Sequence, residues 1–322
     1  GEYPKKVPAP KSLSTARELE VDTNQRTGSV RLKQILRENI TLLLFVLIIV
    51  LFIVGEIVSR GFLSFDHIGA VLRTASFLGI VSIGQTITIL IAGIDLSVGP
   101  LITMGNVFTC MFINGIDGNT IWALAVIIFL GAFFGACNGL GVAYLKISPL
   151  VMTLAIGSLV TGITLIFSQG APKGLASPIL RFIGVGSVLN GVPIIVIVWF
   201  AISALFILLL RSTAFGRKIY YVGANARAAC LSGVRVNYVV IIAYSISGVS
   251  AVLTGALMAG YTQTAFLGIG NEYILWSITA VVIGGTALTG GKGGYLGTVA
   301  GSILLVLLES LLTVIRMPEA GR

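Results

Sequence analysis

The longest polar and basic interruption in this apolar sequence is AFGRKIYYVGANARAACLSGVRV, residues Ala214–Val236. Apolar stretches flank it at Val192–Leu210 and Tyr238–Leu257, each close to the roughly 20 residues that a helix needs to cross a ~30 Å hydrocarbon layer. The interruption must therefore lie in water. Because positively charged loops stay on the cytoplasmic side of a membrane, its basic residues predict that this loop, residues 212–237, is cytosolic.

A short helix is predicted in the centre of this loop, over Asn225–Leu231. Asn225 is a favourable N-cap, small or apolar residues follow it, and Gly233 can end the helix. Such a helix can dock onto a soluble partner, but the loop can equally be an inert connector that its charges hold inside. The residues that we assign to a docking role are Gly216, Arg217, Lys218, Gly223, Asn225, Arg227, Ala228, Ala229, Leu231, Ser232 and Gly233.

The composition excludes an ordinary soluble domain. Hydrophobic residues make up 56% of the chain and charged residues only 10%, against roughly 25% charged in a typical soluble protein. We therefore predict an all-α, polytopic transmembrane bundle. Its net charge of +9 is concentrated in the predicted cytosolic segments, which indicates membrane topology rather than nucleic-acid binding. The three scattered cysteines and the lone His67 suggest neither a disulfide framework nor a metal site.

About nine spans can be counted, all in one transmembrane domain, residues 40–322. They are Ile40–Val58, Ile68–Ala92, Leu101–Ile113, Thr120–Leu145, Leu150–Phe167, Val192–Leu210, Tyr238–Leu257, Leu275–Leu288 and Thr298–Val314. Residues 1–39 are expected to form a disordered cytosolic tail that ends in a short interfacial helix, Val30–Asn39. The amino terminus is thus predicted inside, and nine spans would leave the carboxyl end outside.

Two glycine-rich breaks interrupt the spans, AGIDLSVGP at Ala92–Pro100 and TGGKGGYLG at Thr289–Gly297. Non-helical backbone at membrane depth is tolerated only where protein or a water-filled cavity satisfies its hydrogen bonds, so both breaks are candidate functional elements. Ile83–Gly99 and Ile283–Gly297 share an Ile-Gly-x-Thr opening, which indicates either an internal repeat or a chance similarity in a glycine-rich chain. The glycines that we assign to the breaks are Gly93, Gly99, Gly284, Gly285, Gly290 and Gly291.

Polar residues inside predicted spans are candidates for a solute pathway, because such residues are costly in a membrane. They are Gln85, Thr86, Asp95, Ser97, Asn106 and Asn138. Asp95 can accept hydrogen bonds that tie down the broken backbone or face the pathway, or it can simply cap the helix that opens at Leu96. The amides can instead form hydrogen bonds between helices. Gly131, Gly135 and Gly139, spaced four apart, predict close helix packing. Catalytic triads and a phosphate-binding loop are absent from the sequence, so we expect no enzyme activity and no bound cofactor.

Three stretches together resemble one family. AGIDLSVG at residues 92–99, FGRKIYYVGANARAACLSGV at 215–234 and VVIGGTALTGGKGG at 281–294 closely resemble successive signatures of the permease subunits of bacterial sugar ABC importers. This group includes the ribose, galactose, xylose and autoinducer-2 transporters. FLSFDHIGAVLRTAS at residues 62–76 is similar to the family's segment before its second helix, and the match runs from about Leu32 to about Val314.

The resemblance implies a non-catalytic subunit of the bacterial inner membrane. It would pair with a second copy or a related permease, bind cytosolic ATPases that carry ATP and magnesium at Asn225–Gly233, and receive a sugar from an extracytoplasmic binding protein. Two features depart from the family: Arg227 stands where an acidic residue is common, and the usual tenth span, after Val314, is expected to be missing. An ion-coupled secondary transporter is the alternative, but no paired intramembrane charges support it.

Overall fold

The computed structural model describes residues 40–188 and 191–315, and the predicted interfacial helix at Val30–Asn39 lies outside them. The described part is almost entirely helical, with one short β-hairpin whose two strands have two residues each. Its elements are α2 (Ile40–Val58), α3 (Phe65–Leu90), α4 (Val98–Ile113), the 3-10 turn η1 (Asp117–Asn119), α5 (Thr120–Ala143), α6 (Pro149–Ser168), α7 (Pro178–Val185), β1 (Ser187–Val188), β2 (Val192–Pro193), α8 (Ile194–Ser212), α9 (Ala214–Ala224), α10 (Ala226–Leu231), α11 (Val236–Thr262), α12 (Tyr273–Ile283) and α13 (Tyr295–Val314).

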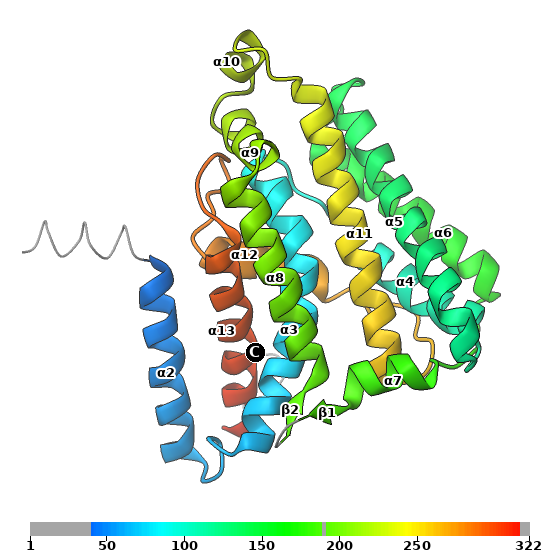
Figure 1. The fold of residues 1–322 in the computed structure, drawn as a ribbon, viewed down its shortest axis with the longest axis vertical. Coiled ribbons are helices and arrows are strands. Elements are labelled where there is room, and N and C mark those ends of the chain that lie inside the picture. Colours follow the sequence, from blue (N-terminus) through cyan, green and yellow to red (C-terminus); the bar gives the residue numbers. More distant parts are fainter. Residues whose placement is uncertain (1–39, 189–190, 316–322) are drawn as a thin grey trace, which may run out of the picture.

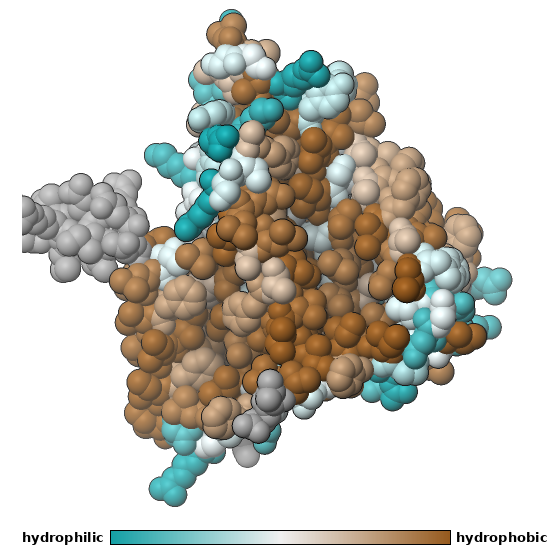
Figure 2. All heavy atoms as spheres, viewed as in Figure 1, coloured by the Kyte–Doolittle hydropathy of each residue, from teal (hydrophilic) through white to brown (hydrophobic). Residues whose placement is uncertain are grey.

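The prediction of a polytopic helical membrane protein is confirmed. Seven helices of the described chain are long and apolar enough to cross a bilayer, and α4 and α12 are apolar but shorter, at 16 and 11 residues. Each of the nine predicted apolar segments therefore corresponds to one helix of the structure. Figure 2 shows a broad apolar belt, with hydrophilic residues gathered at its two ends. We name these ends by the helices that lie there, the α10 end and the α7 end (Figure 1).

Helix α11 lies at the centre of the bundle, and glycines bring two neighbours close to it. A Cβ atom at Gly131, Gly135 or Gly139 of α5 would overlap the backbone of α11, and one at Gly105 of α4 would overlap the backbone at Val252. Lipid is as apolar as the side chains, so van der Waals contact between helices is a main source of stability in a membrane. The sequence prediction of close packing along the α5 glycines is confirmed.

Helix α3 packs on the other side of α11 and also contacts α8 and α13. Inside this group Tyr295 of α13 accepts a hydrogen bond from the Trp199 indole, 3.1 Å, and its hydroxyl donates to the Gly79 carbonyl, 2.8 Å. All three residues are buried. Helix α2 is the outermost helix, packs on α13 and exposes most of its apolar side chains (Figure 1).

Three details of the sequence prediction are wrong. The loop 212–237 contains two helices, because Thr213 caps an additional one, α9, by accepting the Gly216 amide at 3.0 Å. The last but one segment, expected to extend to Leu288, has its helix end at Ile283, since Gly285 adopts a φ of +88°. The short β-hairpin between α7 and α8 was not predicted.

We predict that Gly135→Ala destabilises the protein by about 1–3 kcal/mol, because a Cβ there overlaps the Tyr244 carbonyl of α11. The matched control is Gly162→Ala on α6, where a Cβ meets open space. The control should leave the thermal unfolding midpoint in detergent unchanged or slightly raised, because alanine is a better helix former than glycine. Equal midpoints for the two variants would contradict the close-packing interpretation.

Candidate functional site

Helix α10 forms the tip of the α10 end and follows its predicted pattern (Figure 1). The Asn225 side chain accepts a hydrogen bond from the Ala228 amide at 2.9 Å, and Gly233 has a φ of +82° just after the helix. Leu231 is 85% exposed and only Ala229 is buried. The predicted short helix is thus confirmed, and it presents an apolar side chain to the solvent.

Helix α9 lies between this tip and the bundle, and its last turn meets both glycine-rich breaks. The Gly291 amide donates to the Leu90 carbonyl at 2.9 Å, which joins the second break to the end of α3. Gly223 of α9 is buried directly against the two atoms of this bond, and a Cβ on Gly223 would overlap them. We call this contact between Gly223, Leu90 and Gly291 the junction.

The end of α3 at the junction is a Schellman motif, in which backbone amides after the helix return to its last carbonyls. Gly93 donates to Thr88 at 2.8 Å and Ala92 donates to Ile89 at 2.9 Å. The left-handed position of this motif usually holds glycine, but here Ala92 adopts it with a φ of 60°. The first break therefore begins with a tightly hydrogen-bonded turn at an alanine.

In the structure the second break is the whole loop between α12 and α13, residues 284–294, instead of the 289–297 expected from the sequence. Hydrogen bonds hold it at both sides of its glycine turns. The Tyr220 hydroxyl of α9 donates to the Gly293 carbonyl at 3.0 Å, and the Thr286 hydroxyl accepts from the Gly294 amide at 3.3 Å. Burial raises the pKa of Tyr220, although Arg211 opposes the shift, so the hydroxyl stays protonated as a donor. The break is therefore tied to α9 at Gly293 as well as at the junction.

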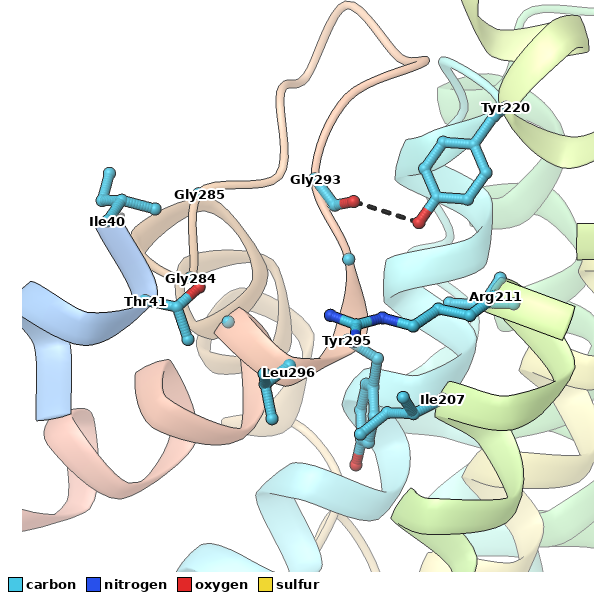
Figure 3. A pocket seen from close by; sticks show the side chains of 13 residues that line it. Ile40, Thr41, Ile207, Arg211, Tyr220, Gly284, Gly285, Gly293, Tyr295 and Leu296 are labelled. Atoms are coloured by element: carbon cyan, nitrogen blue, oxygen red, sulfur yellow. Dashed lines mark hydrogen bonds between the residues drawn. The ribbon is translucent and has the colours of Figure 1, made fainter. Parts of the chain in front are cut away.

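A cavity of about 310 Å³ borders the second break on the side away from Gly223. Figure 3 shows that the Arg211 side chain reaches from the end of α8 toward the start of α13, with Tyr220 above it and Ile40 on the far side. The break is thus packed tightly against α9 but borders open space toward α2 and α8.

The remaining break glycines allow close contacts elsewhere. A Cβ on Gly93 would lie 2.5 Å from the Tyr244 hydroxyl, and one on Gly99 would lie 2.8 Å from the Gly270 carbonyl. Gly284 packs against the backbone of Gly297, which joins the end of α12 to the start of α13. Gly285 has a φ of +88°. These four glycines do not form part of the junction, whereas a Cβ on the fifth, Gly290, would lie 2.9 Å from the Gly223 carbonyl.

Asp95, Ser97 and Asn138 form one buried chain of hydrogen bonds. One carboxylate oxygen of Asp95 accepts from the Ser97 amide at 2.9 Å and from its hydroxyl at 2.6 Å, and Asn138 of α5 donates to the same hydroxyl at 2.9 Å. The other carboxylate oxygen of Asp95 has no hydrogen bond among the described residues. The geometry agrees with a residue that holds the broken backbone before α4, which was one of the two alternatives for Asp95.

The other predicted pathway residues are equally buried but lie apart from this chain. Thr86 pairs with Thr298 of α13 at 3.0 Å, and the Asn106 carbonyl oxygen accepts from the Phe266 amide at 2.8 Å. Both polar atoms of the Gln85 amide lack a partner in the described part of the chain. The six candidates therefore do not line a single open cavity, and each is fully enclosed in the protomer.

Sequence reasoning missed two kinds of functional residue. Leu90 and Gly293 act through backbone carbonyls, which no side-chain pattern reveals. Tyr220 and Tyr244 reach the breaks with hydroxyl groups, since Tyr244 donates to the Ile94 carbonyl at 3.5 Å. Both tyrosines lie far from the two breaks in the sequence, so no sequence signal pointed to these contacts.

Comparison with known proteins identifies the class of this molecule. Residues 67–321 match the family model described as the branched-chain amino acid transport system permease component. The chain belongs to this family of ABC transporter permeases, which also contains the ribose-type permeases. It is therefore a transport subunit and not an enzyme, and such subunits bind no cofactor.

Individual relatives match most of the chain. The ribose import permease protein RbsC of Haemophilus influenzae is 32% identical over 275 residues, which cover 84% of each protein. The ribose import permease protein RbsC of Bacillus subtilis is 33% identical and covers 83% of each. The autoinducer 2 import system permease protein LsrC of Escherichia coli O157:H7 is 34% identical, covering 87% of this chain and 81% of the relative. No solved structure matches the chain.

We predict that Gly223→Ala separates α9 from the two breaks, because its Cβ cannot fit beside the Leu90 carbonyl and the Gly291 amide. ATP-driven solute uptake by the assembled transporter should fall by about tenfold or more, since overpacking of this kind costs about 1–3 kcal/mol. The control is Gly294→Ala in the second break, where φ is 168° and the nearest atom to a Cβ is 3.5 Å away. Similar uptake by both variants would show that ATP-driven transport does not need the junction.

Proposed function

We propose that this permease translocates a monosaccharide or a similar polyol across the bacterial inner membrane, with its amino terminus in the cytosol. A separate cytosolic ATPase, carrying ATP and magnesium, would supply the energy. The basic residues of the α10 end support this orientation, because Arg217, Lys218 and Arg227 all lie there and positively charged loops stay inside. Docking on Asn225–Gly233 would place the ATPase against α10.

The junction is the observation that carries this proposal. A force applied to α10 passes to α9 through the Asn225 cap, and from the last turn of α9 to both breaks through Gly223. Backbone packed against backbone moves as a unit, because no flexible side chain lies between the parts. Closure of the ATPases would therefore displace the end of α3 and the loop before α13 together.

The partners follow from the same geometry and from the family. A second copy or a related permease would complete the transporter, and an extracytoplasmic binding protein would deliver the sugar to the α7 end. Arg227 is exposed on α10, in the docking surface, where the family commonly has an acidic residue. We infer that this position selects a particular ATPase or reflects pairing with a different permease.

The sugar class is supported by the chemistry of the helices that surround α11. Their polar groups are mostly uncharged hydroxyls and amides, which suit a neutral polyol better than an ion. The relatives are named for ribose and for autoinducer 2. Ribose is therefore the first solute to test.

We predict that Leu231→Asp weakens ATPase binding and abolishes coupled uptake while the permease still inserts in the membrane, because Leu231 is the most exposed apolar side chain of α10. Gly233→Trp should act similarly, since φ of +82° disfavours any residue other than glycine. The measurements are co-purification with the cognate ATPase and ribose uptake into proteoliposomes that contain ATP and the binding protein.

The matched control is Leu175→Asp at the α7 end, where the leucine is 54% exposed. It should leave the ATPase bound, because it lies on the opposite side of the apolar belt. Wild-type coupling of ATP hydrolysis to uptake in both Leu231→Asp and Gly233→Trp would refute the docking role of this loop. Uptake of a sugar without any ATPase would refute the proposed function as a whole.

A further inference from the structure

Helix α3 begins at the α7 end of the bundle and carries one arginine, Arg73 (Figure 1). This residue lies about 12 Å along the helix from its first residue, Phe65. The rest of the helix, residues 74–90, contains no charged side chain, and every residue from Ala75 to Leu90 is buried. A charge inside an apolar helix is costly in a membrane, so such a residue usually has a specific partner and a role.

The partner of Arg73 lies in α7. Its Nη2 atom donates a hydrogen bond to the Val185 carbonyl at 3.4 Å, and Val185 is the last residue of α7. The last carbonyls of a helix have no acceptor role within it and carry a partial negative charge, so a guanidinium is a suitable donor there. Among the described residues, this is the one hydrogen bond between α3 and α7.

Other contacts fasten α7 to the central helices of the bundle. A Cβ on Gly184 would lie 2.5 Å from the main chain of Gly260, so the backbones of α7 and α11 touch there. At the start of α7, the N-cap Ser177 accepts a hydrogen bond from the Thr120 hydroxyl of α5 at 2.9 Å. Helix α7 therefore connects α5, α11 and, through Arg73, α3.

The opposite side of α7 faces away from the protomer. Ile179 and Phe182 are 51% and 58% exposed, and Arg181 between them is exposed as well. This is the end of the bundle where the proposed function places the extracytoplasmic binding protein. A protein bound there can contact α7 directly.

The guanidinium of Arg73 is only partly satisfied. Its Nε atom is buried and has no hydrogen-bond partner in the described part of the chain. An unpaired buried donor is unfavourable, so a displacement of α7 or α3 that brings an acceptor to Nε would be stabilised. The contact is therefore suited to hold α7 in more than one position relative to α3.

The other end of α3 lies at the junction. The Leu90 carbonyl accepts from the Gly291 amide there and lies directly against Gly223 of α9. Arg73 and Leu90 are 17 residues apart in one continuous helix, a distance of about 26 Å. Helix α3 thus runs from the contact with α7 to the contact with the loop helices.

We propose that Arg73 is a positioning residue that sets the place of α3 relative to α7, so that a protein bound at the α7 end changes ATP hydrolysis at the α10 end. The inference rests on the proposed function. It names the side chain through which α7 acts on the junction. A purely structural role of Arg73, as a clamp that only keeps α7 folded, is the competing outcome.

The test uses the reconstituted complex of permease, ATPase and binding protein, with ATP hydrolysis measured before and after addition of ribose-loaded binding protein. Arg73→Ala should reduce the increase caused by the binding protein by about fivefold or more, the lower end of typical coupling between two sites. Hydrolysis without binding protein, and the amount of co-purified ATPase, should stay at the wild-type level. Loss of this basal hydrolysis at a normal ATPase content would assign Arg73 a structural role and overturn the inference.

Two further variants separate the hydrogen bond from the size of the side chain. Arg73→Lys keeps a charged donor and should retain more of the stimulation than Arg73→Met, which keeps a long side chain without one. Equal stimulation in the lysine and methionine variants would contradict the proposed contact. The control is Arg60→Ala, an exposed arginine in the turn before α3, which should behave as wild type. An equal loss in this control would show a general effect of positive charge at the α7 end.

Failure of this inference differs from failure of the proposed function. If the wild-type complex imports ribose and its hydrolysis responds to the binding protein, but Arg73→Ala responds equally well, only the role of Arg73 is wrong. If the wild-type complex neither responds to the binding protein nor takes up a monosaccharide, the proposed function itself is wrong.

Discussion

The hydrogen bond from the Gly291 amide to the Leu90 carbonyl, covered by Gly223, is the contact on which the α10 end of this permease depends. It brings together three segments that are far apart in the sequence. Only glycine at position 223 allows the backbone of α9 to approach this closely. In the proposed mechanism, a movement of the loop helices would therefore reach both breaks through main-chain atoms. Glycines of α5 and α4 likewise place backbones against α11, where contact area replaces the hydrophobic driving force that water provides in soluble proteins.

Polar residues of the bundle differ in burial. Asp95, Ser97 and Asn138 form one buried chain of hydrogen bonds that holds the backbone before α4, although the second Asp95 carboxylate oxygen and the Asn138 amide oxygen have no partner among the described residues. Asn271 and Glu272, by contrast, are exposed on the surface of the protomer.

Local chemistry made part of the site predictable. The cap at Asn225, the glycine after α10 and the glycine spacing of α5 each depend on neighbours within one or two turns, and all three appear in the structure as expected. Helix α9, the additional helix of the loop, was not predicted because its stability comes from burying Ile219 and Val222 against the bundle. The contact of Arg73 with α7 was missed because it joins residues 112 positions apart in the sequence.

By itself, the sequence determined that this chain is a helical protein that crosses a membrane several times and carries a basic loop between two of its apolar stretches. Hydropathy and charge decide those properties residue by residue, since each apolar stretch partitions into lipid largely independently of the rest. Only the tertiary structure decided that the loop touches both breaks, that Asp95 is enclosed and that Glu272 is exposed. Those properties depend on contacts between residues distant in the chain, and helix packing creates them.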